Sequence, residues 1–167
     1  MSTRVQSLPS QRAVAGDGLL HPVAWIAVAL LVLNDHVLKQ AYPSALTGKL
    51  SDVAGLVFFP LLLQALWELA ERRVAARFAP SRRVLLTVTC ATAVVFASIQ
   101  LFPAAATSYR VGLGAVQWPF VAVLSLLGGL GLPPLTPVHL TQDPTDLLAL
   151  PALLVPLWLG SRRAARG

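Results

Sequence analysis

The chain has 167 residues, of which 56% are hydrophobic and only 12% charged, with 13 Lys and Arg against 7 Asp and Glu. Soluble domains carry about a quarter charged residues, so this composition excludes a disordered chain and an ordinary soluble domain. Apolar runs lie at about 19–33, 53–70, 84–106, 113–132 and 147–160. They reach or approach the ~20 residues that cross a hydrocarbon layer. The sequence therefore predicts an all-α integral membrane protein.

The first part of the chain is expected to form a tail and two helices. Residues 1–18 are polar and contain Pro, Gly and Ser, which predicts a mobile N-terminal tail. One helix is expected at 19–33 and a second at about 52–70. The polar segment 34–52 joins them.

The second part is expected to contain two further helices and an insert. A third helix covers about 84–103, where Pro103 ends it. A last helix runs from about 145 to 160 and precedes the basic tail 161–167. The stretch 113–132 is long enough to span, but its internal Pro and repeated Gly are poor material for a straight helix.

The basic residues predict the topology. Ten of the thirteen lie in the N-terminal tail, in the loop before the third helix and at the C-terminus: Arg4, Arg12, Arg72, Arg73, Arg77, Arg82, Arg83, Arg162, Arg163 and Arg166. Such clusters beside apolar runs are typical of the cytoplasmic side of a membrane rather than of a nucleic-acid surface. All three lie on one side only if the number of spans is even. We therefore favour four transmembrane helices with 113–132 as an interfacial or re-entrant insert, and five transmembrane helices as the alternative.

An internal repeat is visible at an offset of 94 residues. The segment PSALTGKLSD (43–52) aligns with PVHLTQDPTD (137–146) with four identities in ten, and each precedes an apolar helix. This predicts two helix-pair repeats, 19–70 and 84–160, within a single membrane domain.

The repeat also predicts the location of a functional site. Proteins built from such repeats often place their site at the repeat interface. The single membrane domain is expected to cover 19–160. At the same offset Lys49 meets Asp143, which predicts an ion pair between the halves that offsets the cost of desolvating both charges.

Polar side chains in and beside these two segments form the candidate site. Ionisable groups at membrane depth are costly and often mark a pathway or a site. The candidates are Asn34, Asp35, His36, Lys39, Lys49, Ser51, Asp52, His139, Thr141, Asp143 and Asp146.

Three chemistries remain open for these residues. A metal site would draw on carboxylate and imidazole donors, with His36, Asp52, His139 and Asp146 as weak candidates. No HxxxH or HExxH spacing occurs, so no metal and no cofactor is assigned. A lipid-directed enzyme would use Asp52 or His36 as general base, and a transport or proton path would use Asp52 and Asp146 on the repeated helices.

Helix capping explains the presence of some of these polar residues without a catalytic or binding role. The stretch DPTD (143–146) has the pattern of a helix start, with Asp143 as N-cap and Asp146 reaching back. Ser51 and Asp52 are candidates to cap the second helix in the same way.

Ion pairing within helices explains others. Asp35 and Lys39 are four residues apart in the favourable order, and Glu68 and Arg72 repeat that spacing at the end of the second helix. Both are predicted to form surface pairs.

Three motifs carry a resemblance. NDHVLK (34–39), LTGKLSDVAGL (46–56) and DPTDLLALP (143–151) resemble motifs of an uncharacterised family of small bacterial multi-pass membrane proteins. The resemblance implies a bacterial inner (cytoplasmic) membrane location, with both termini expected in the cytoplasm, and implies no catalytic residues.

We therefore expect a structural or accessory subunit, or a binding module for a lipid or a partner. Its expected partners are the lipid bilayer and another membrane protein or a second copy of the chain, and not nucleic acid. Whether the protein is an enzyme stays open, and the sequence favours a protein that is not an enzyme. The alternative is a small transporter or a lipid-directed membrane enzyme that uses the Asp and His residues of the candidate site.

Overall fold

The computed structural model describes residues 14–42, 44–74 and 80–164. These residues form helices and connecting segments, with no strand among them. Within these described ranges, five helical segments are long and apolar enough to cross a membrane: Pro22–Ala41, Leu46–Val74, Arg82–Leu101, Pro103–Leu127 and Pro144–Arg163. The all-helical, multi-pass character expected from the sequence is confirmed.

The first helical segment is longer than predicted. After the 3-10 helix η1 (Asp17–Leu20), α1 covers Pro22–Leu33 and continues through the π-helical turn η2 (Asn34–Leu38) into α2 (Lys39–Ala41). His21 caps α1, because its Nδ1 accepts a hydrogen bond from the Val23 backbone N–H at 3.2 Å.

The prediction that 34–52 is a linker is therefore wrong. α3 covers Ala45–Val74 and begins seven residues before the predicted start at 52. Ser44 and Thr47 cap it reciprocally: the Thr47 N–H donates to Ser44 Oγ (3.3 Å), and the Ser44 N–H donates to Thr47 Oγ1 (3.1 Å). Ser51 and Asp52 lie inside α3, so the prediction that they cap it is also wrong.

α4 and α5 follow one another almost without a gap. α4 covers Arg82–Leu101 and α5 covers Pro103–Leu127. Phe102 has extended backbone angles, and Pro103 is the first helical residue of α5, where its missing N–H costs nothing. α4 thus ends at Leu101, two residues before the predicted end at 103. The predicted start of the insert at 113 is wrong, because a new helix begins at 103 and continues past Pro119.

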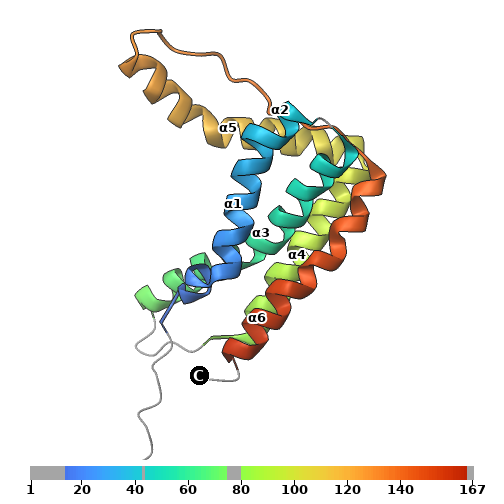
Figure 1. The fold of residues 1–167 in the computed structure, drawn as a ribbon. Helices are drawn as coiled ribbons and strands as arrows, with labels where there is room; N and C mark the ends of the chain where they lie inside the picture. The colour runs from blue at the N-terminus through green and yellow to red at the C-terminus, as the bar shows by residue number, and fades with distance from the viewer. Residues whose placement is uncertain (1–13, 43, 75–79, 165–167) are drawn as a thin grey trace, which may run out of the picture. The chain divides into compact units, whose positions relative to one another are not determined.

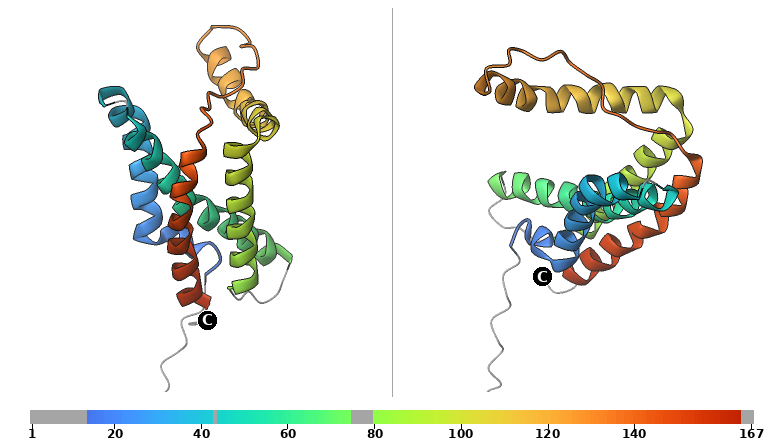
Figure 2. Two further views of the ribbon diagram at one scale, coloured as in Figure 1. Left: turned by 90° about the vertical axis from the view of Figure 1, so that its right-hand side faces the viewer. Right: turned by 45° about the horizontal axis from the view of Figure 1, so that its top comes forward.

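The chain then turns back on α5. We name residues 128–143 the return segment; it contains no helix and runs along α5 towards the start of that helix, as Figures 1 and 2 show. Gly129 and Gly131 have positive φ angles of 71° and 78°, which glycine adopts without strain, where the chain reverses.

The last helical segment consists of the 3-10 helix η3 (Pro144–Leu153) and α6 (Leu154–Ala164). The first four residues of the predicted basic tail, 161–164, therefore belong to a helix. Residues 165–167 lie outside the described residues.

The described chain forms two compact units. Unit one contains the described residues up to Ala93 and those from Ala149 onward, and unit two contains Val94–Leu148. These boundaries fall inside α4 and η3 and differ from those of the predicted repeats, which stay a prediction.

Small residues bring the helices of unit one together. Ala24 and Ala27 of α1 are buried, and α1 and α3 lie side by side (Figure 1). Gly160 of α6 faces Leu85 of α4 so closely that a Cβ at Gly160 would lie 2.6 Å from the Leu85 side chain. Small residues of this kind allow close approach of helix backbones in membrane proteins.

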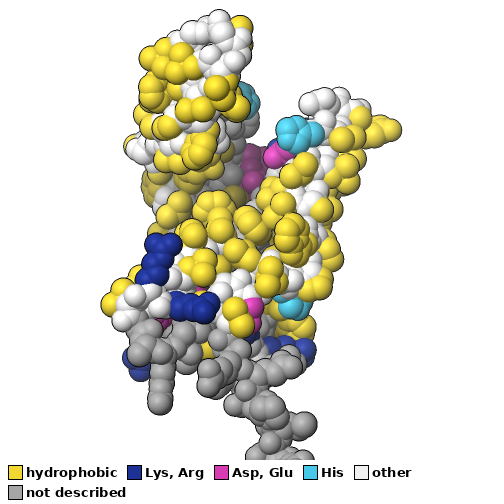
Figure 3. Space-filling model, turned by 90° about the vertical axis from the view of Figure 1, so that its left-hand side faces the viewer, with side chains coloured by type: hydrophobic (Ala, Val, Ile, Leu, Met, Phe, Trp, Pro, Cys, Tyr) yellow, Lys and Arg dark blue, Asp and Glu magenta, His cyan; other side chains and the backbone are white. Residues whose placement is uncertain are grey.

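Large apolar side chains lie on the outside instead. Trp25, Ile26, Phe59 and Trp67 of unit one are all more than half exposed. Figure 3 shows apolar side chains over the middle of one face and Lys and Arg side chains towards its lower end. This distribution is the one expected for helices surrounded by lipid.

Candidate functional site

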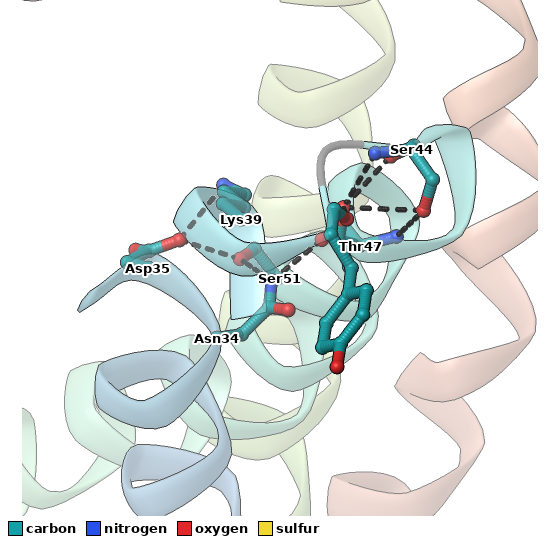
Figure 4. A network of polar contacts seen from close by, with 7 residues as sticks. Asn34, Asp35, Lys39, Ser44, Thr47 and Ser51 are labelled. Atoms are coloured by element: carbon teal, nitrogen blue, oxygen red, sulfur yellow. Dashed lines mark hydrogen bonds and ion pairs between the residues drawn. The ribbon is translucent and has the colours of Figure 1, made fainter. Parts of the chain in front are cut away.

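Five of the residues where α1–α2 meets α3 form a polar network, which we name the Asn34 cluster (Figure 4): Asn34, Asp35, Lys39, Thr47 and Ser51. Asn34 Nδ2 donates hydrogen bonds to the Thr47 carbonyl oxygen (2.5 Å) and to Ser51 Oγ (2.7 Å). Ser51 Oγ in turn donates to Asp35 Oδ1 (2.8 Å). Four of the predicted site residues are thus brought together, with Thr47 in addition.

The members of the Asn34 cluster differ in burial. Asn34 is fully buried, and its Oδ1 has no hydrogen-bond partner. Lys39 Nζ lies 2.7 Å from Asp35 Oδ1, which confirms the predicted ion pair, but both side chains are substantially exposed. An exposed pair contributes little to stability. The buried amide therefore dominates the energetics of the cluster.

A second polar network lies in unit two, where α4 ends and η3 begins. Gln100, which is buried, donates from Nε2 to Asp146 Oδ2 (3.2 Å) and accepts from the Asp143 N–H at Oε1 (3.2 Å). Gln142 Nε2 donates to the Ile99 carbonyl oxygen (2.8 Å). These bonds hold the start of η3 against the end of α4.

The predicted helix start at 143 is confirmed. Asp143 Oδ1 accepts hydrogen bonds from the Thr145 N–H (2.8 Å) and from Thr145 Oγ1 (2.7 Å), and Pro144 is the first residue of η3. Gln100, which organises this junction, was not among the predicted site residues. Its signal in the sequence is an amide at the end of an apolar run.

The remaining predicted residues occupy several places. His36 is exposed on η2, and Lys49 and Asp52 are half-buried in α3. His139 and Thr141 are exposed on the return segment. Among the residues that the structure describes, no three His, Cys, Asp or Glu side chains lie close enough together to hold a metal ion. The predicted pairing of Lys49 with Asp143 stays a prediction.

A third network lies at the end of α3, and the sequence does not predict it. Glu68 is only 2% exposed and accepts from Arg163 Nη1 (2.7 Å) and Nη2 (2.9 Å). Gln64 Nε2 (3.0 Å) and the Gly16 N–H (2.9 Å) also donate to it. Asp17 forms an ion pair with Arg163 Nε. We name these five residues the Glu68 cluster.

The Glu68 cluster corrects two predictions. Glu68 pairs with Arg163 of α6, while Arg72 is exposed, so the predicted pair with Arg72 is wrong. The inward direction of Glu68 explains this, because the residue one turn before it, Gln64, is also buried and bonds to it. The Glu68 side chain therefore follows the buried face of α3 rather than its surface.

The second correction concerns the predicted mobile tail. Arg163 Nη2 donates to the Val14 carbonyl oxygen (2.8 Å), and Gly16 bonds to Glu68. Residues 14–18 are therefore packed against α3 and α6, because they satisfy part of a buried ion pair. Residues 1–13 of the predicted tail lie outside the described residues.

Comparison with known proteins gives no further assignment. No model of a known protein family matches the chain, no curated protein is similar to it, and no solved structure matches it. The resemblance to a family of small bacterial membrane proteins therefore stays a prediction.

Proposed function

We propose that the protein is a non-enzymatic scaffold of a membrane, a structural or accessory subunit whose polar residues fasten helices rather than perform chemistry. The observation that carries this proposal is that each polar network joins separate elements. The Asn34 cluster joins α1–α2 to α3, and the Glu68 cluster joins η1 and α3 to α6. Gln100 joins α4 to η3. Buried polar groups that are hydrogen-bonded in this way define one packing of the helices.

We propose further that the scaffold has four spans. Glu68 is near the end of α3 and Arg163 near the end of α6, so their contact supports both ends lying on one side of the membrane. Between these ends α4 would cross in one direction and η3–α6 would cross back. The chain between them leaves α4 after Gln100 and returns to Gln100 at Asp146, so that it adds no net crossing.

The charge distribution supports the orientation of this topology. Exposed arginines lie at the end of α3, the start of α4 and the end of α6: Arg72, Arg73, Arg82, Arg83 and Arg162. The positive-inside rule assigns this side to the cytoplasm. With the sequence resemblance, it supports a bacterial inner membrane protein with both termini in the cytoplasm.

A transport or proton path is the second candidate, and one observation favours it. Asn34 is buried inside a candidate span, in a π-helical turn, with an oxygen that has no partner. Such turns occur frequently at functional sites, and a buried unsatisfied polar atom requires an explanation.

Elemental analysis and lipid mass spectrometry of gently purified protein, combined with thermal unfolding, test the scaffold proposal. We expect no stoichiometric metal or single phospholipid species. We also expect Asp146→Ala to lower Tm, because the buried Gln100 amide loses its acceptor at a cost of about 1–3 kcal/mol. Thr141→Ala, which changes an exposed residue nearby, is the control and should leave Tm unchanged. A stoichiometric ligand that Asp52→Asn and Asp146→Asn remove at unchanged Tm would instead establish a chemical or transport site.

A further inference from the structure

The hairpin formed by α5 and the return segment is held together along its length. Trp118 Nε1 donates to the Pro133 carbonyl oxygen at 2.9 Å. Closer to the start of α5, Arg110 Nε donates to the Val138 carbonyl oxygen (3.2 Å), and the Val138 N–H donates to the Arg110 carbonyl oxygen (3.1 Å). We name residues 103–143 the α5 hairpin.

One stripe of α5 faces the return segment. Gly114 is the buried residue of this stripe. A Cβ at Gly114 would collide with the Thr136 carbonyl oxygen, so glycine is required for this close approach. Arg110, Gly114 and Trp118, each four residues apart, form the inner side of the hairpin.

The opposite side of α5 is apolar. Two residues onward on an α-helix correspond to a rotation of ~200°, so each residue two positions after the inner stripe points away from the return segment. Val116 and Phe120 are two such positions, Leu124 and Leu127 follow one and two turns further on, and these four side chains are 65–81% exposed. We name them the outer stripe: Val116, Phe120, Leu124 and Leu127.

The return segment differs from α5 in its backbone. Most of its residues are exposed, Leu130 and Leu132 among them, and it has no helix that would satisfy its own N–H and C=O groups. An irregular backbone exposed to hydrocarbon leaves polar groups unsatisfied at several kcal/mol each. The return segment therefore requires water, lipid headgroups or ordered polar partners, whereas the outer stripe requires an apolar neighbour.

The low charge of the α5 hairpin and the attachment of its two ends indicate which apolar neighbour covers the outer stripe. Residues 103–142 contain no Asp or Glu, and Arg110 is their only Lys or Arg. Both ends of the α5 hairpin meet where α4 ends and η3 begins, at Gln100 and Asp146. Under the four-span topology this junction lies at a membrane surface, so the apolar helix is held beside the bilayer.

We propose that the α5 hairpin lies in the plane of the bilayer surface, with its outer stripe among the lipid acyl chains and its return segment towards water. The proposal rests on the four-span topology. Interfacial helices bury one apolar face at the boundary of headgroups and acyl chains. Apolar residues also flank the outer stripe, with Val111, Val121 and Leu126 exposed as well. So broad an apolar surface fits fluid lipid better than a narrow protein groove.

Spin-label accessibility tests the proposal. The full chain carrying Cys90→Ala is reconstituted in nanodiscs of equal parts phosphatidylcholine and phosphatidylglycerol, and single nitroxides are attached at Val116→Cys, Phe120→Cys and Leu124→Cys. We expect all three to collide more with oxygen than with a water-soluble nickel chelate, at one common depth. Leu135→Cys, an exposed apolar position on the return segment, is the matched control and should favour the nickel chelate.

Three results would overturn the proposal in distinguishable ways. A depth that changes by about 12 Å from Val116 to Leu124, the axial rise over eight residues, means that α5 crosses the membrane, and the four-span topology fails with it. Shielding of the outer stripe from both reagents means that another protein or a second copy covers it, while the topology survives. High nickel access on both sides places the hairpin in water, again without affecting the topology.

Discussion

Glu68 illustrates how single side chains determine the packing of this protein. Its carboxylate is buried and accepts from a guanidinium, an amide and a backbone N–H. A buried charge is tolerated only when it is paired and hydrogen-bonded. The backbone N–H and the guanidinium come from residues 52 and 95 positions away, so the carboxylate links distant parts of unit one.

Removing one partner of this pair is expected to destabilise the protein strongly. Arg163→Gln leaves the buried carboxylate without its cation, at a cost of about 3–5 kcal/mol. Glu68→Gln with Arg163→Gln should cost less than the sum of the single changes, because no unpaired charge remains. Thermal or denaturant unfolding in detergent measures this coupling. Arg72→Gln is the control; a loss as large as that of Arg163→Gln would mean that Glu68 pairs with Arg72 after all.

Asn34 allows a second test at the same scale. Asn34→Ala removes both hydrogen bonds that Asn34 donates to α3 and leaves Ser51 Oγ and the Thr47 carbonyl oxygen without this donor. We expect a loss of about 1–3 kcal/mol, read as a lower Tm. His36→Ala, on the exposed side of the same turn, should be neutral. Equal effects of the two changes would contradict a structural role for the cluster.

At the scale of elements, the sequence predicts which apolar stretches are helical but not where α3 begins. The rise in hydrophobicity predicts a start at about 52, whereas the helix begins at 45. The local signal is the pair Ser44 and Thr47, a capping box with Thr in place of Glu or Gln. Polar residues inside the helix, such as Ser51, then bond to a neighbouring helix, which a single-chain pattern does not reveal.

Gly114 provides a test of the α5 hairpin as an element. Gly114→Ala places a Cβ against the return-segment backbone, so the hairpin should open and the amide of Val138 should exchange faster with deuterium. Gly112→Ala is the matched control, since a Cβ there meets nothing within 4 Å. It should be neutral or stabilising by up to ~1 kcal/mol, because Ala is the better helix former. Faster exchange in both variants, or in neither, would contradict the role of Gly114.

At the scale of the whole molecule, composition predicts a helical membrane protein, and charge predicts an even number of spans. The sequence could not reveal that the insert is a helix with a returning segment, because contacts such as Trp118 to Pro133 depend on tertiary structure. The Glu68 cluster could not be predicted from the sequence for the same reason. Its partners are far apart in sequence and, taken alone, resemble ordinary residues of a basic flank.

Thiol labelling tests the topology. On a Cys90→Ala background, Arg73→Cys and Arg162→Cys should react with a membrane-impermeant maleimide from one side of sealed vesicles, and Tyr42→Cys from the other. All three residues are exposed, so reactivity reports sidedness rather than burial. Labelling of Arg73→Cys and Arg162→Cys from opposite sides would rule out four spans.

The pairing of Glu68 with Arg163 has a consequence for biosynthesis. The carboxylate is made 95 residues before the guanidinium that neutralises it. Until α6 has been translated and inserted, α3 carries a carboxylate that is buried in the folded protein and whose cation does not yet exist. The final packing of α3 is therefore coupled to completion of the last helix. A nascent chain that stops before Arg163 should be recognised as unfolded by membrane quality control.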